Sequence, residues 1–114
     1  GCFDILHFGH INYLSREADL GNVLIVGVNS DSSVKKLNKG NSRPLQDEKS
    51  RATILASLAC VSAVIIFEED TPYELIRTVQ PDFLVKGGDW KPEEIVGFDI
   101  VKAKGGEIIS LAFV

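Results

Sequence analysis

The chain begins with GCFDILHFGH, residues Gly1–His10, and this stretch decides how the remaining sequence is interpreted. It places His7 and His10 on either side of a glycine, with an acid, Asp4, three residues before the first histidine. Residues 9–19 carry apolar side chains at spacings of three and four, which predicts a loop that turns into a helix near His10. The unpaired N–H groups at a helix start favour an anion, and imidazoles there can add hydrogen bonds and positive charge. The stretch therefore predicts a cradle for a phosphate chain.

Two other interpretations of the histidines stay open at this point. Two histidines three residues apart are often a helix cap, a core pair or surface residues. A zinc site is the second alternative, but His7 and His10 are the only histidines, and Cys2 and Cys60 form no close-spaced ligand pair. The complete string Gly-x-Phe-Asp-x-x-His-x-Gly-His is much more specific than a histidine pair. We therefore interpret it as functional and expect no metal held by protein ligands.

Length and composition limit the chain to one domain. Its 114 residues suffice for one hydrophobic core but not for two. The formal net charge of −4, without a long basic run, argues against a nucleic-acid surface, so any anion site must be local. No apolar run approaches the roughly 20 residues of a membrane span, and no signal-peptide pattern is visible. Two cysteines in a chain of this kind are typical of a reducing compartment. We expect a cytoplasmic protein without nucleic-acid or membrane partners.

Both ends of the sequence are abrupt. A motif such as Gly1–His10 normally follows a buried strand, and no strand precedes it here. The last residues, Leu111–Val114, are apolar and carry no cap. We therefore expect residues 1–114 to be a single domain, present as the core fragment of a somewhat longer one, with its first strand missing.

Apolar runs alternate with helical patterns along the rest of the chain. The pattern predicts strands at 23–28, 61–67, 83–85 and 107–113, and helices at 32–37, 46–59, 72–79 and, with a break, 92–103. Ser30 or Asp31 is expected to cap the first of these helices, Asp47 to lie in the first turn of the second, and Thr71 to cap the third. This alternation predicts an α/β fold with a parallel sheet and with ligands at the carboxyl edge of its strands.

Polar loops between these elements offer further candidate residues. Lys35 and Lys36 fit a solvated surface, whereas Lys39 lies in a flexible loop after the strand at 23–28. Arg51 lies in the first half of the helix predicted at 46–59 and fits a surface residue paired with Asp47.

Two later stretches fit either an ordinary turn or a ligand site. The acidic residues Glu68–Asp70 fit a solvated turn better than a metal site. The stretch Lys86–Trp90, at a strand exit, contains two glycines that would let a base approach the backbone, or it is an ordinary turn.

The string Gly1–His10 resembles the signature of the cytidylyltransferase-like nucleotidyltransferases. The resemblance implies a Rossmann-like fold, with helices on both faces of a parallel sheet, that transfers a nucleotidyl group from a nucleoside triphosphate. Further stretches are similar to the heptose 1-phosphate adenylyltransferases: Val26–Asp31, Leu58–Val61, Leu84–Trp90, Glu94–Gly97 and Gly105–Glu107. This similarity implies that ATP and a heptose 1-phosphate give ADP-heptose and pyrophosphate, for bacterial surface glycans such as lipopolysaccharide.

The resemblance also implies roles for individual residues. Those implied to be catalytic are His7, His10, Lys39 and Arg51, which would stabilise charge on the phosphates. Those implied to border the nucleotide are Cys2, Phe3, Gly9, Lys86, Gly87 and Asp89, the last three beside the adenine. Asp4 would orient the acceptor substrate or a metal-bound water. Mg²⁺ is the implied cofactor, held mainly by phosphate oxygens of the nucleotide.

The sequence departs from the family pattern at its end and leaves other functions open. The family normally continues, after a stretch like Leu111–Val114, into a Ser/Thr-rich motif that holds the triphosphate. A glycerol-3-phosphate cytidylyltransferase has the same first motif, and a nucleotide-binding module without catalysis is a second alternative. A flavodoxin-like electron carrier would fit the fold but not the histidines. A homodimer and a fused or separate sugar kinase domain also stay open.

Overall fold

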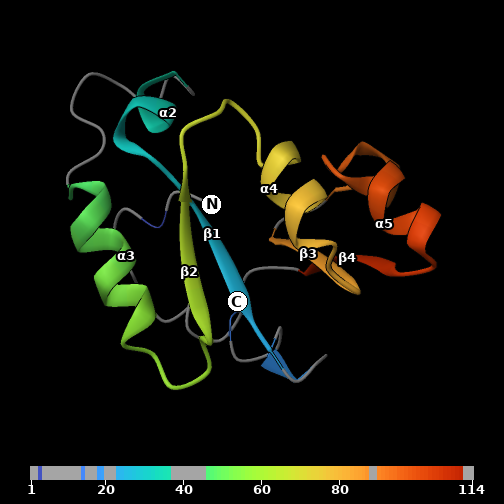
Figure 1. The fold of residues 1–114 in the computed structure, drawn as a ribbon, viewed down its shortest axis with the longest axis horizontal. Helices are drawn as coiled ribbons and strands as arrows, with labels where there is room; N and C mark the ends of the chain where they lie inside the picture. The colour runs from blue at the N-terminus through green and yellow to red at the C-terminus, as the bar shows by residue number, and fades with distance from the viewer. Residues whose placement is uncertain are drawn as a thin grey trace.

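The structure, a computed structural model, describes residues 3, 14, 18–19, 23–36, 46–87 and 90–111. Strands and helices alternate along this part of the chain (Figure 1). The elements are β1 (Ile25–Asn29), α2 (Asp31–Lys36), α3 (Glu48–Ala56), β2 (Ala63–Phe67), α4 (Tyr73–Val79), β3 (Phe83–Gly87), the 3₁₀ helix η1 (Pro92–Glu94), α5 (Phe98–Lys104) and β4 (Glu107–Leu111). None of the helices in the described ranges is long and apolar enough to cross a membrane.

The strands pair as two parallel ladders within the described residues. In the first, β1 lies beside β2, with Ile25 opposite Ala63 and Asn29 opposite Phe67. In the second, β3 lies beside β4, with Phe83 opposite Glu107. Parallel strands need a crossover connection, and helices supply it in each ladder. The carboxyl ends of the two strands in each ladder therefore meet at one edge. The predicted α/β fold with parallel strands is confirmed.

Helices cover both faces of the first ladder (Figure 1). Val26 and Val28 of β1 belong to a buried cluster with Leu55 of α3 and Leu14. Gly27 lies between the two valines and faces the opposite side of the ladder, because successive strand residues alternate. A Cβ placed on Gly27 would meet the Leu75 side chain of α4 at 2.9 Å, so α4 packs closely on this face. Burying side chains of this size contributes about 1.5–3 kcal/mol each, so this alternation fixes which face each helix covers.

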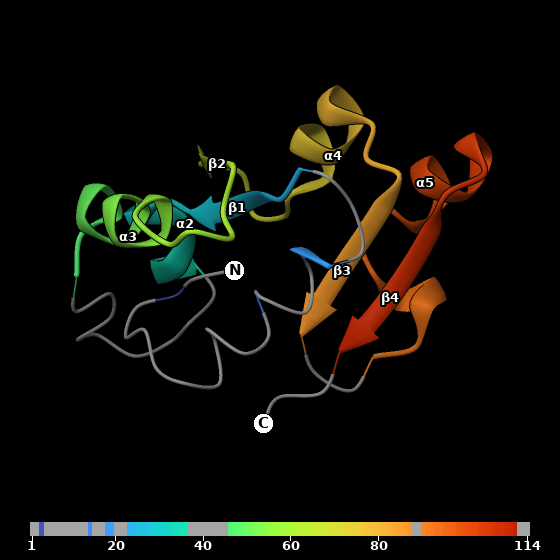
Figure 2. The ribbon, with the colours of Figure 1, turned by 90° about the horizontal axis from the view of Figure 1, so that it is seen from below.

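Helix α4 also contacts the second ladder, and Figure 2 shows it above β1 and β3 in that view. Its Ile76 belongs to a second buried cluster with Ile95, Val101 of α5 and Ile108 of β4. Leu84 of β3 packs against the same cluster. One helix therefore packs against both ladders.

The predicted caps are partly confirmed. Ser30 caps α2, because its hydroxyl accepts a hydrogen bond from the Ser33 N–H at 3.2 Å. Asp47 lies one position before α3 rather than in its first turn, and its carboxylate accepts from the Ser50 N–H at 2.7 Å. The prediction of Thr71 as a cap is wrong. The first turn of α4 closes on the Pro72 carbonyl, which accepts from the Ile76 N–H at 2.9 Å, so Pro72 occupies the cap position.

Element boundaries differ from the predictions by a few residues. β3 runs to Gly87 instead of ending at residue 85, because its ladder with β4 continues to the pair Gly87–Leu111. α3 ends at Ala56 rather than at residue 59. The predicted break in the helix at 92–103 is confirmed, since Gly97 with φ of 94° separates η1 from α5.

Candidate functional site

The described residues contain part of the predicted site. Phe3, Arg51, Lys86 and Gly87 lie within them. The remaining predicted residues lie outside: Cys2, Asp4, His7, Gly9, His10, Lys39 and Asp89. Arg51 of α3 contacts the carboxyl end of β1, and Lys86 lies near the carboxyl end of β3.

A buried polar network forms the carboxyl edge of the first ladder. The Ser30 N–H donates to the Phe67 carbonyl at 2.9 Å and extends the ladder past the end of β1. Asn29, only 5% exposed, donates from its side-chain amide to the Ser33 hydroxyl at 2.9 Å. That hydroxyl donates in turn to the Glu69 carbonyl at 2.9 Å. The turn into α2 is thereby joined to the loop that follows β2.

Arg51 lies at the centre of this edge and is 1% exposed. Its Nη1 donates to the Asn29 carbonyl at 2.7 Å, its Nη2 to Asp31 Oδ1 at 2.8 Å and its Nε to the Gln46 carbonyl at 3.1 Å. The interpretation as a surface arginine paired with Asp47 is therefore wrong. Arg51 is one helical turn before the buried Leu55, so both point from α3 toward β1. The implied contact of Arg51 with phosphates stays a prediction.

Asp31, the partner of Arg51, was missed by sequence reasoning as a site residue. Besides its ion pair with Arg51, its backbone N–H donates to Glu48 Oε1 at 3.0 Å. The first residues of α2 and α3 are therefore held together at the end of β1. The sequence signal was weak, because the two partners are 20 residues apart and an acid after a strand is also a common helix cap.

Lys86 and Trp90 lie at the carboxyl edge of the second ladder. The Lys86 ammonium is 5.0 Å from the centroid of the Trp90 ring. The Trp90 backbone N–H donates to the Ser110 hydroxyl at 3.2 Å, and Ser110 is the register partner of Lys86 on β4. Gly87 follows Lys86 as the last residue of β3. Sequence reasoning named Lys86 and Gly87 but gave Trp90 no role, although it lies four residues beyond Lys86.

Phe3 is the described residue of the N-terminal string. Its φ of 49° is in the left-handed region, which non-glycine residues rarely adopt and which is often found at functional sites. The residue packs against the cluster formed by Leu14, Val26, Val28 and Leu55. Phe3 is therefore attached to the core beside β1.

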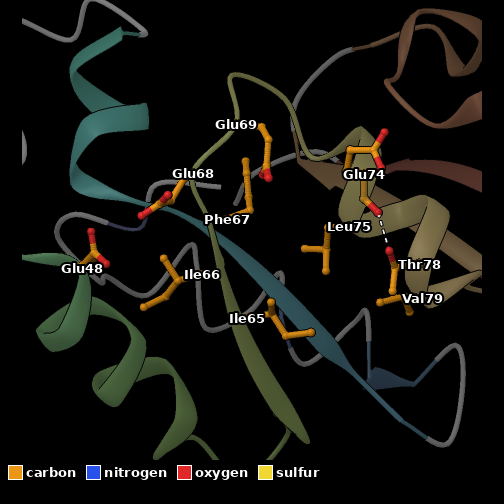
Figure 3. A pocket seen from close by; sticks show the side chains of 10 residues that line it. All are labelled: Glu48, Ile65, Ile66, Phe67, Glu68, Glu69, Glu74, Leu75, Thr78 and Val79. Atoms are coloured by element: carbon orange, nitrogen blue, oxygen red, sulfur yellow. Dashed lines mark hydrogen bonds between the residues drawn. The ribbon is translucent and has the colours of Figure 1, made fainter.

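A groove of about 640 Å³ runs beside β2 and α4 (Figure 3) and shares Phe67, Glu69 and Glu48 with the carboxyl edge of the first ladder. Its lining is Glu48, Ile65, Ile66, Phe67, Glu68, Glu69, Glu74, Leu75, Thr78 and Val79. No predicted site residue lines it. Its glutamates and apolar side chains suit a polyphosphate poorly, because a phosphate chain needs positive charge or N–H donors.

Several loop predictions are also settled by the described residues. Lys35 and Lys36 are exposed at the end of α2, and Glu68, Glu69 and Asp70 are exposed as expected for a solvated turn. Lys36 and Asp70 approach each other to 3.5 Å. Within the described ranges, no three His, Cys, Asp or Glu side chains come together as a metal site.

Parallel α/β ladders with polar networks at their carboxyl ends, joined to a His-x-Gly-His string, define a nucleotide-binding protein of the nucleotidyltransferase class. The sequence matches the family model described as cytidylyltransferase-like over residues 1–103, and the chain belongs to this family.

Curated relatives and a solved structure agree with this assignment. The chain is 64% identical over 102 residues to the bifunctional protein HldE of a Nitratiruptor species, covering 90% of this chain and 22% of the relative. It is 54% identical over 114 residues to the bifunctional protein HldE of Geobacter metallireducens, covering 100% of this chain and 23% of the relative. The crystal structure of the lipopolysaccharide core biosynthesis protein from Thermoplasma volcanium GSS1 is similar with a TM-score of 0.80 and 29% identity, covering 100% of this chain and 91% of that one. The chain thus spans less than a quarter of the length of these curated relatives.

Proposed function

We propose that the protein containing this chain transfers an adenylyl group from ATP to a heptose 1-phosphate, giving ADP-heptose and pyrophosphate. The observation that carries the proposal is the string Gly1–His10 in a chain of the cytidylyltransferase-like family that is 64% identical to a bifunctional protein HldE. The similarity to a lipopolysaccharide core biosynthesis protein supports a product used for surface glycans.

The proposed reaction is an in-line displacement at the α-phosphorus of ATP. An oxygen of the sugar 1-phosphate forms the new P–O bond while the bond to pyrophosphate breaks, and the electron pair leaves with the bridging oxygen. The attacking oxygen is already anionic, so no strong general base is needed. Catalysis then rests on positioning and on charge stabilisation. His7 and His10 donate to the phosphate oxygens, and the nearby polyanion favours their charged form.

Other residues have supporting roles in this proposal. Lys39 and Arg51 supply positive charge near the phosphates, and Asp4 orients the acceptor. The backbone of Cys2, Phe3 and Gly9 borders the triphosphate. Mg²⁺, held mainly by nucleotide phosphate oxygens, neutralises phosphate charge when bound.

The test is pyrophosphate release by the full-length protein, with ATP and CTP each combined with heptose 1-phosphate and glycerol 3-phosphate. We expect release only with ATP and the heptose. Release with CTP and glycerol 3-phosphate would overturn the substrates but keep the reaction class. Nucleotide binding without turnover in all four mixtures would instead identify a binding module.

His10→Ala tests the mechanism in the same assay. Because this change removes a charge-stabilising donor, we expect the rate to fall by about 10²-fold or more. The exposed Lys35→Ala is the matched control and should leave the rate unchanged. A near-normal rate in His10→Ala would contradict the role given to the histidine.

The description of the relatives as bifunctional supports a second activity in the part of the protein outside this chain. We propose a sugar kinase there, because a kinase would supply a phosphorylated sugar to the adenylyl transfer. We also propose that the protein is cytoplasmic.

A further inference from the structure

Lys86 and Trp90 combine a positive charge with an exposed aromatic surface at one strand edge. The Trp90 side chain is large, and the residue is 46% exposed. The Lys86 ammonium lies over its ring at 5.0 Å and forms no ion pair with a carboxylate in the described part of the chain. An exposed indole beside an uncompensated cation suits a ligand that is both flat and anionic.

The pair is held from both strands of the second ladder. Lys86 and Ser110 are register partners, so their side chains point to the same face. Ser110 accepts the Trp90 N–H at 3.2 Å, and Lys86 contacts the ring. Two residues earlier on the same face, Leu84 and Ile108 pack in the cluster around Val101. The indole is therefore attached to a packed part of the fold and lies at the strand edge where parallel α/β sheets bind ligands.

From this geometry we propose that Trp90 stacks on the adenine base of ATP and that Lys86 orients the indole. The inference rests on the proposed function and adds a residue that recognises the base. Both substrates are anionic, but only the nucleotide presents a flat aromatic ring. Stacking between a base and an aromatic side chain is strong enough to change affinity by about tenfold.

The test is steady-state kinetics of the full-length protein, with ATP and heptose 1-phosphate varied in turn. For Trp90→Ala we expect the KM for ATP to rise about tenfold, with kcat and the KM for the sugar phosphate nearly unchanged. Trp90→Phe, which keeps an aromatic ring, should recover most of the affinity. Tyr73→Ala is the matched control, since Tyr73 is also an exposed aromatic residue, 37% exposed, but lies at the start of α4.

A KM for ATP that is unchanged in Trp90→Ala would overturn the inference, as would a rise in the KM for the sugar phosphate instead. If Trp90→Ala fails to fold, the tryptophan fluorescence of the unmodified protein tests whether Trp90 contacts ATP. Trp90 is the only tryptophan in these 114 residues, and the spectrum of Trp90→Phe subtracts any tryptophan elsewhere in the protein. Titration with ATP should change the Trp90 signal, and a signal that does not respond to ATP would overturn stacking.

These outcomes separate the inference from the function on which it rests. Normal adenylyl transfer together with a Trp90 fluorescence signal that does not respond to ATP would refute stacking and keep the proposed function. A Trp90 signal that responds to ATP in a protein without turnover would refute the transfer reaction and keep the base site.

Discussion

At the scale of single residues, Arg51 connects the end of β1, the start of α2 and Gln46, two residues before α3, through side-chain hydrogen bonds. Arg51→Ala would leave the Asn29 carbonyl and the Asp31 carboxylate without this partner. Removing one member of a buried charge pair is costly, and we expect a loss of about 3 kcal/mol in the free energy of unfolding. Urea denaturation of the protein measures this loss.

Arg77→Ala is the matched control for that experiment. Arg77 pairs with Glu74 on the surface, with side chains 61% and 55% exposed. Exposed ion pairs contribute little to stability, so the urea midpoint should hardly move. Equal effects of the two substitutions would contradict the structural importance of Arg51.

Asp47 gives α3 a pH-dependent cap. Hydrogen bonds from the Ser50 backbone N–H and then the Ser50 hydroxyl lower the pKa of Asp47 below its ordinary value of 3.8. A depressed pKa stabilises the fold above the unfolded-state value, and this stabilisation is lost as the pH falls through the folded-state value. Asp47→Ala should therefore lower the stability of the fold at neutral pH and hardly change it in strong acid. Thermal unfolding between pH 2 and 7 measures the difference from wild type. A difference that does not vary with pH would contradict the charged cap.

At the scale of elements, α5 is flanked by two glycines in the left-handed region, Gly97 before it with φ of 94° and Gly105 after it with φ of 88°. A Cβ at Gly97 would meet Ile76 at 2.7 Å, whereas a Cβ at Gly105 would meet nothing within 4 Å. We expect Gly105→Ala to cost about 1 kcal/mol through backbone strain alone. Gly97→Ala should cost about 1–3 kcal/mol more, because overlap with Ile76 adds to the strain. Urea midpoints of the two variants make the comparison, and equal losses would show that packing around Gly97 adds nothing.

The sequence predicted the elements better than their contacts. Apolar runs located every described strand, although only β1 is largely buried, since Ile65 and Ile66 of β2 are each 36% exposed and Phe83 of β3 is 39% exposed. The ends were less certain, as at Ser62, whose N–H still bonds the Leu24 carbonyl one position before β2 begins. The burial of Arg51 could not be foreseen, since it depends on acceptors at Asn29 and Asp31 that only tertiary structure brings near. The contact of Lys86 with Trp90 also depends on how the chain turns after β3.

At the scale of the whole molecule, the proposed Mg²⁺ belongs to the nucleotide rather than to the protein. Chelation by EDTA should therefore stop pyrophosphate release while leaving the unfolding temperature of the nucleotide-free protein unchanged. Added Mg²⁺ should restore turnover. A fall in unfolding temperature on chelation would indicate a metal held by the protein itself. Turnover that continues in EDTA would remove Mg²⁺ from the mechanism.

Helix α4 packs against both ladders through adjacent residues, with Leu75 against Gly27 and Ile76 against Gly97. Inserting or deleting one residue before them within α4 would rotate both side chains by about 100° and remove both contacts together. We therefore expect the length of this helix to be more tightly constrained than the lengths of the loops beside it. Among related sequences, we expect insertions and deletions to accumulate between Glu68 and Pro72 and to be absent from Tyr73–Val79.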